Sequence, residues 1–139
     1  MNFQELVSLY FERSNAMQTY WGFYITIVIG LLAFFGTIKA SPQKRILAIL
    51  VSIGFAGFAY VNGDAIRDVV KTRSVTQQLI LTYKDCDPTK QADIDKIGKT
   101  IRTADVRWVM GFHIASDLGV LAAIWVLTLN ERMPKSKQA

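Results

Sequence analysis

The stretch that decides the fold runs from residue 108 to residue 130 and reads WVMGFHIASDLGVLAAIWVLTLN. Among these 23 residues, the only ionisable side chains are those of His113 and Asp117. An α-helix rises about 1.5 Å per residue, so roughly 20 apolar residues cross the hydrocarbon layer of a membrane. The stretch therefore predicts a membrane-spanning helix over 108–130.

Two further runs are long enough to cross a membrane. Residues 14–38 carry no charge over 25 positions, and residues 46–63 carry none over 18. They predict two more spans, which form a helical hairpin over 19–63 with a short loop at 39–45. For this chain of 139 residues, 51% of them hydrophobic, the expected fold class is all-α, a polytopic membrane protein with three transmembrane helices.

The segment 1–18 has the pattern of an amphipathic helix. Phe3, Leu6 and Tyr10 recur at spacings of three and four, with polar residues between them. Asn2 is a suitable N-cap residue, with a glutamate three positions further on. We expect a short interfacial amphipathic helix that lies along the membrane surface. The alternative is that this helix packs on the outer rim of the protein itself.

The segment 64–107 is expected to leave the bilayer as a helical stalk. Its first part continues the second span, and Asp87 followed by Pro88 is a typical helix start. From there apolar residues alternate at spacings of three and four without a break up to residue 129. This pattern predicts one long third helix from about 88 to 130, roughly 65 Å in length, that extends out of the bilayer. The stalk would pack on the continuation of the second helix or on a second copy of the chain.

Basic residues predict which side of the membrane each loop faces. The loop 39–45 carries three basic residues and no acid, and the tail 131–139 carries three more. Cytoplasmic loops are enriched in Lys and Arg, so both are expected in the cytoplasm, with the N-terminus and 64–107 outside. The nine basic residues in 64–107 are the evidence against this orientation. The expected location is the plasma membrane, which in a bacterium is the inner membrane.

His113 and Asp117 form the strongest candidate site, because ionisable side chains in the middle of a span are costly. Four residues apart on a helix, the imidazole and the carboxylate face the same side and can interact. The pair suits a proton relay or a cation site. It is equally compatible with a hydrogen-bonded contact between helices, or with a water-filled niche.

A row of small residues follows the same helix and predicts close helix packing in lipid. It consists of Gly111, Ala115, Gly119 and Ala123. At about 100° per residue, the polar pair lies about 200° around the helix from the first two members of the row. The third span must then be covered on two sides, which predicts a homo-oligomer or a membrane protein partner.

Composition and motifs favour a non-enzymatic function. One histidine provides too few ligands for a metal site, and the chain has neither a phosphate-binding loop nor a nucleophile elbow. No cofactor, metal or small-molecule substrate is expected. The net charge of +5 comes with no nucleic-acid-binding motif, so the expected surroundings are the lipid bilayer rather than DNA or RNA.

The favoured function is therefore that of an oligomeric accessory, assembly or interaction subunit of a membrane. The principal alternative is an oligomeric pore or an ion or proton pathway lined by His113 and Asp117. The three spans, outer N-terminus and short basic inner tail resemble the layout of some phage holins, although the long second loop departs from that layout. A membrane enzyme is the third and least favoured reading.

Overall fold

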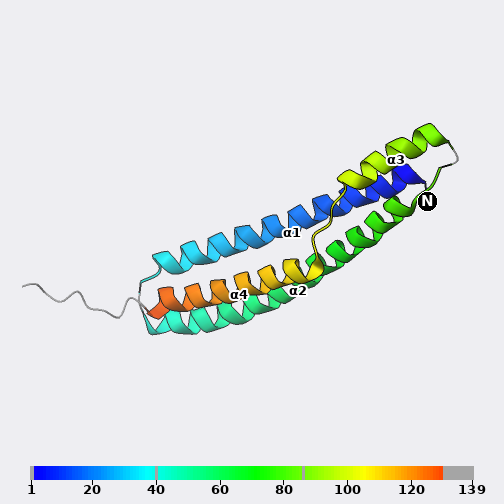
Figure 1. Ribbon diagram of the computed structural model, residues 1–139. Helices are drawn as coiled ribbons and strands as arrows, with labels where there is room; N and C mark the ends of the chain where they lie inside the picture. Colours follow the sequence, from blue (N-terminus) through cyan, green and yellow to red (C-terminus); the bar gives the residue numbers. More distant parts are fainter. Residues whose placement is uncertain (1, 40, 86, 130–139) are drawn as a thin grey trace, which may run out of the picture.

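The chain folds into four α-helices in the computed structural model, which describes residues 2–39, 41–85 and 87–129 (Figure 1). In chain order these helices are α1 (Phe3–Thr37), α2 (Pro42–Thr82), α3 (Pro88–Thr100) and α4 (Val106–Leu129). The all-α prediction is confirmed. The tail 131–139 lies outside the described residues.

Three of the helices, α1, α2 and α4, are long and apolar enough to cross a membrane. Their 35, 41 and 24 residues correspond to about 52, 61 and 36 Å of helix. The three candidate spans are confirmed, and they indicate a membrane location. Because α1 and α2 are much longer than α4, both project past it at one end, where α3 joins them (Figure 1). We call this projecting part, residues 3–14, 68–82 and 88–105, the head.

Side chains at the expected positions define the helix starts. Asn2 and Glu5 form a capping box, in which the Asn2 side chain accepts from the Glu5 amide at 2.9 Å. The Ser41 side chain caps α2 with proline next in the chain, and the Asp87 side chain accepts from the Thr89 amide at the start of α3. These caps satisfy amides that have no partner within their own helix. The predicted starts at Asn2 and Asp87 are confirmed.

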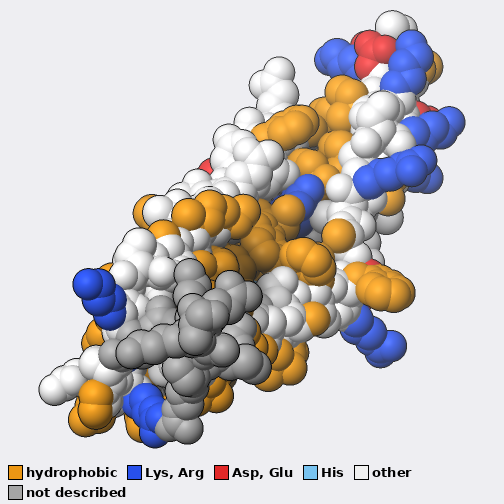
Figure 2. All heavy atoms as spheres, turned by 90° about the vertical axis from the view of Figure 1, so that its left-hand side faces the viewer, with side chains coloured by type: hydrophobic (Ala, Val, Ile, Leu, Met, Phe, Trp, Pro, Cys, Tyr) orange, Lys and Arg blue, Asp and Glu red, His pale blue; other side chains and the backbone are white. Residues whose placement is uncertain are grey.

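The apolar core of the spans lies where α1, α2 and α4 meet. Tyr24 and Phe35 of α1 pack there with Phe55 of α2 and Ile124 of α4, and all four are buried. Large apolar residues on the outer faces of the same helices are exposed, as expected for surfaces that contact lipid. In Figure 2, viewed from the end opposite the head, hydrophobic side chains cover much of the near part, and charged side chains are densest at the far end.

The prediction of a separate interfacial helix over 1–18 is wrong. Helix α1 runs from Phe3 to Thr37 without interruption, so its first half is continuous with the candidate span. Its apolar face is buried inside the head, where Leu6 and Tyr10 pack against Ile80 of α2. The alternative, packing on the protein itself, is the one observed. Tertiary burial of this face explains why the helix does not need the lipid surface.

The head also contains a buried arginine. Arg73 of α2 donates a hydrogen bond from Nη2 to the Tyr10 hydroxyl at 2.9 Å and lies over the Tyr10 ring, 4.9 Å from its centroid. The Tyr10 hydroxyl in turn donates to the carbonyl oxygen of Arg102 at 2.5 Å. This chain of contacts links α2, α1 and the segment after α3.

The prediction of one long helix over 88–130 is also wrong, because the segment 101–105 separates α3 from α4. Asp105 ends the interruption as the cap of α4, since its side chain accepts from the Arg107 amide at 2.7 Å. The segment 101–105, which we call the connector, makes tertiary hydrogen bonds through backbone carbonyl groups that a continuous helix would use internally. Ile101 is buried, and the Gln77 side chain donates to its carbonyl oxygen at 2.8 Å. The stalk is thus a packed head, in which α3 lies against α2.

A buried lysine fastens the opposite end of the spans. Lys44, only 2% exposed, lies in the first turn of α2. Its Nζ donates to the carbonyl oxygens of Ile38 at 2.7 Å and Leu127 at 3.1 Å. These carbonyls belong to the C-terminal ends of α1 and α4, where the helix dipoles favour a cation. One side chain therefore joins the ends of three helices.

Candidate functional site

His113 and Asp117 lie on the inward face of α4. The face is identified by Val120 and Ile124, which follow them along the helix and are buried in the core between the spans. His113 is 1% exposed and the Asp117 side chain 19% exposed. The polar pair is therefore covered by helices of its own chain.

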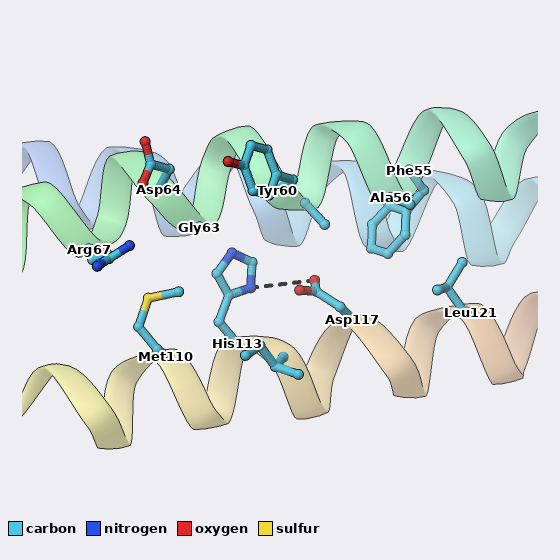
Figure 3. A pocket seen from close by; sticks show the side chains of 12 residues that line it. Phe55, Ala56, Tyr60, Gly63, Asp64, Arg67, Met110, His113, Asp117 and Leu121 are labelled. Atoms are coloured by element: carbon cyan, nitrogen blue, oxygen red, sulfur yellow. Dashed lines mark ion pairs between the residues drawn. The ribbon is translucent and has the colours of Figure 1, made fainter.

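The two side chains of the pair are close but not hydrogen-bonded. His113 Nδ1 and Asp117 Oδ1 are 3.4 Å apart, an ion-pair distance that is long for a hydrogen bond (Figure 3). Neither nitrogen of His113 has a hydrogen-bond partner among the described residues, and Asp117 Oδ1 has none there either. The large majority of buried side-chain polar atoms have such a partner, so these atoms have the capacity to bind one from outside the chain.

Aromatic residues of α1 close one side of the imidazole. The Tyr24 ring meets the His113 ring edge-on with 4.9 Å between centroids, and the Trp21 ring lies 5.6 Å from it. The Tyr24 hydroxyl is buried beside the Asp117 carboxylate. The imidazole is thus held in one orientation by packing rather than by hydrogen bonds.

A glycine of α2 makes room for the imidazole on the other side. A Cβ atom added to Gly63 would lie 3.1 Å from His113 Cδ2 and 3.2 Å from Nε2, closer than most carbon contacts in proteins. The absence of a side chain at Gly63 therefore lets the ring approach the backbone of α2.

A cavity of about 360 Å³ lies between α2 and α4 next to the pair (Figure 3). Its ionisable lining residues are Asp64 and Arg67 of α2 together with His113 and Asp117. The remaining lining residues are apolar or aromatic, apart from the glycine: Phe55, Ala56, Ala59, Tyr60, Gly63, Met110, Ile114 and Leu121. A largely apolar cavity with a few convergent polar groups is typical of a small-molecule binding site.

The site extends from the head end of the spans toward the middle of α4. His113 is seven residues from the start of α4, about 10 Å of helix. It touches α2 at Gly63, the last residue of an uncharged run, and Asp64 follows directly. Asp117 lies one turn further from the head, 11 residues and about 16 Å from the start of α4, so it is near the middle of that helix.

The predicted packing row faces away from this site. Gly111, Ala115 and Gly119 are exposed, and Ala123 is half-buried. A Cβ atom added to either glycine would have no neighbour within 4 Å among the described residues. The row thus lies on the opposite side of α4 from the polar pair, as its spacing predicts, and none of the described helices covers its exposed members.

Several residues of the site were not predicted from the sequence. The sequence pattern places Asp64 and Arg67 in the stalk segment 64–107, and it gives no individual signal for Gly63 or Tyr24, which lie within uncharged runs. The sequence does contain a signal for Asp64 and Arg67, because charged residues that directly follow an uncharged run are expected at the membrane boundary. The position of Tyr24 on another helix required the tertiary structure.

The unpartnered atoms indicate what this arrangement can do chemically. An imidazole and a carboxylate beside a cavity can donate and accept hydrogen bonds from a polar ligand or water, and they can exchange protons with it. Within the described part of the chain, no three His, Cys, Asp or Glu side chains converge as metal ligands. Comparisons with models of protein families, with curated proteins and with solved structures found no match to this chain.

Proposed function

We propose that this chain is a non-enzymatic interaction subunit of a membrane, which self-associates through the outer face of α4. The observation that carries the proposal is the uncovered row on that face. Gly111 and Gly119 have open space where a side chain would be, and Ala115 between them is exposed. In lipid, small residues at this spacing allow two helix backbones to approach closely.

The internal packing of the chain supports this use of α4. The inward face of α4 is already occupied by α1 and α2, so its outer face is the one left for another molecule. The α4 row holds four small residues, three of them exposed and Ala123 half-buried, and is one residue longer than the exposed set of Gly22, Thr26 and Gly30 on α1. Close packing over a longer row gains more dispersion energy, which favours α4 as the contact helix.

The head provides a second surface for a membrane protein partner. Val75 and Leu79 of α2 are about half exposed there and lie one turn apart on the same face of the helix. Leu79 is 16 residues beyond Gly63, about 24 Å along the helix, so this surface lies outside the hydrocarbon layer. Apolar residues that gather on a water-exposed surface are typical of contact sites between proteins.

The internal placement of the polar pair favours an interaction subunit over a pore. If copies associate through the outer face of α4, His113 and Asp117 point into each protomer instead of toward a shared axis. Beyond Asp117 the inward face of α4 continues with Val120 and Ile124, and among the described residues the next ionisable group on this path is Lys44, at the far end. That apolar stretch is a barrier to ions.

The distribution of charge supports an orientation for the subunit. The loop 39–45 and the tail 131–139 are basic, so we propose that they face the cytoplasm of a plasma membrane. The N-terminus and the segment 64–107, which form the head, would then face the outside.

Oligomeric state in mild detergent tests this proposal. The wild-type chain is expected to form a defined oligomer by light scattering coupled to chromatography. Gly111→Leu combined with Gly119→Leu is expected to give monomers, because two large side chains separate the helices. Gly57→Leu is the matched control: this glycine of α2 also has open space around it and should leave the oligomer intact. A monomeric wild type, or dissociation by the control alone, contradicts the assignment.

Proteoliposomes separate this function from the pore. The proposal expects no protein-dependent ion or proton leak, and no effect of Asp117→Asn on the background leak. A leak that depends on Asp117 would replace the interaction subunit by an ion or proton pathway.

A further inference from the structure

We propose that the cavity between α2 and α4 binds a membrane lipid whose headgroup carries both a phosphate and a primary ammonium group, as phosphatidylethanolamine does. The proposal is independent of self-association, because the cavity and the small-residue row lie on opposite sides of α4.

The polarity of the cavity changes along the helix axes. Arg67 and Asp64 lie at its head end, His113 and Asp117 follow, and Phe55 and Leu121 lie at the other end (Figure 3). In a membrane these axes run across the bilayer. The cavity therefore has charged groups at one end and apolar groups at the other. A lipid molecule is divided in the same way into a charged headgroup and apolar chains, whereas a soluble ion has no apolar part.

The charged end lies at the depth of the lipid headgroups. Gly63 ends the uncharged run of α2, and Asp64 and Arg67 follow within one turn. Tyr60 and Ile114 line the same cavity and are exposed, so it opens sideways to the surrounding lipid. A lipid can thus enter from the bilayer without crossing water.

Polar groups of the cavity, buried at His113 and Asp117 Oδ1 and exposed at Asp64 and Arg67, lack the partners that such a headgroup would supply. Both nitrogens of His113 and Asp117 Oδ1 are without a hydrogen bond among the described residues. No ion pair joins Asp64 or Arg67 to another residue that the structure describes, although the two are one turn apart on α2. The site therefore holds one guanidinium, two carboxylates and an imidazole with unused capacity.

This set of groups matches a phosphate next to an ammonium. A guanidinium binds phosphate through two parallel N–H donors. Carboxylates accept hydrogen bonds from a primary ammonium, which has three N–H donors, whereas a choline group has none. The volume of about 360 Å³ accommodates a headgroup and the first part of one chain, with the rest of the lipid remaining in the bilayer.

The test measures lipid binding to the purified full chain by native mass spectrometry. Phosphatidylethanolamine, phosphatidylcholine and phosphatidylglycerol with the same acyl chains are titrated separately. The wild type is expected to bind the ethanolamine lipid at least about tenfold more tightly than either other lipid, since one hydrogen bond to a charged group accounts for that factor. Equal binding of the three lipids, or a preference for phosphatidylglycerol, overturns the proposal.

Variants at the exposed residues Asp64 and Arg67, and an isosteric variant at the partly buried Asp117, assign the groups. Arg67→Gln is expected to weaken the ethanolamine and choline lipids alike, because both carry the phosphate. The matched control Lys71→Gln, at an exposed residue of α2 that is not among the cavity-lining residues, is expected to change neither. Asp64→Asn and the isosteric Asp117→Asn are each expected to reduce the preference for ethanolamine over choline. If neither reduces it, or if Lys71→Gln acts like Arg67→Gln, the assignment is wrong.

A soluble competitor distinguishes a lipid from a free phosphate compound. Glycerophosphoethanolamine has the same headgroup and no acyl chain. It is expected to displace the lipid only at a concentration at least about a hundredfold higher, because burial of each methylene group contributes about 0.8 kcal/mol. Displacement at equal concentration would show that the ligand is a soluble phosphate compound and would overturn the lipid assignment.

Discussion

Replacing Gly63 with alanine places a methyl group against the His113 ring. The added carbon would lie 3.1 Å from Cδ2 of the ring, and the ring cannot move away freely because Tyr24 and Trp21 pack against it. Crowding of this kind in a packed interior costs about 1–3 kcal/mol. The same substitution removes a glycine from the middle of a helix, which contributes about 1 kcal/mol in the opposite direction.

A second glycine separates these two effects. Gly57 lies in the same helix, and a Cβ atom added there would meet nothing within 4 Å. Gly57→Ala should therefore show the gain in helix stability alone. The difference between the two changes in the free energy of unfolding cancels this gain. Gly63→Ala is therefore expected to be about 1–3 kcal/mol less stable than Gly57→Ala.

The free energy of unfolding in detergent, followed by circular dichroism during denaturant titration, measures this difference. A rescue experiment identifies the contact, because Gly63→Ala should cost nothing in a chain that already carries His113→Ala. Equal stability of Gly63→Ala and Gly57→Ala, or a penalty that survives the removal of His113, would refute the close contact between α2 and α4.

Two further substitutions test the ends of the bundle. Tyr10→Phe removes the oxygen acceptor of the buried Arg73 guanidinium and leaves it, among the described residues, only the weak acceptor Met17 Sδ, so the free energy of unfolding is expected to fall by about 1–3 kcal/mol. Amide exchange in 101–105 is expected to become faster, because the Tyr10 hydroxyl also binds the Arg102 carbonyl oxygen; unchanged exchange there would contradict this link. Lys44→Met keeps the aliphatic stem but removes a cation from two helix ends, with an expected loss of about 1–3 kcal/mol in the same unfolding assay. Lys44→Arg, which keeps the charge, should lower the free energy of unfolding less. A Lys44→Met variant as stable as wild type would show that the helix ends do not need the charge.

Much of the span architecture follows from uncharged length alone. The runs at 14–38, 46–63 and 108–130 contain the candidate spans because only apolar side chains suit a lipid-facing helix. The helix starts at Asn2 and Asp87 were predictable because capping depends on neighbouring residues.

The head was harder to predict because its structure depends on contacts between distant segments. The apolar repeat after Pro88 continues through 101–105, yet Gln77 and Tyr10 take the carbonyl oxygens of that segment as partners. Tertiary contacts thus override a regular local pattern. Asp105 followed by Val106 was the available local signal, since aspartate is a preferred cap residue.

The site was predicted in part for the same reason. The spacing of His113 and Asp117 places them together on one helix face, which requires only the geometry of a single helix. The approach of Gly63 and the covering ring of Tyr24 come from two other helices. No pattern within 108–130 specifies those neighbours.

The unbroken course of α1 and α2 from spans into head has a mechanical consequence. Beyond Gly63, the 19 residues of α2 that remain form a rigid arm of about 28 Å. Transmembrane helices change their tilt as bilayer thickness changes. A change of about 10° swings the tip of such an arm sideways by about 5 Å. The tip of α2 would therefore move sideways with any change in the tilt of its span.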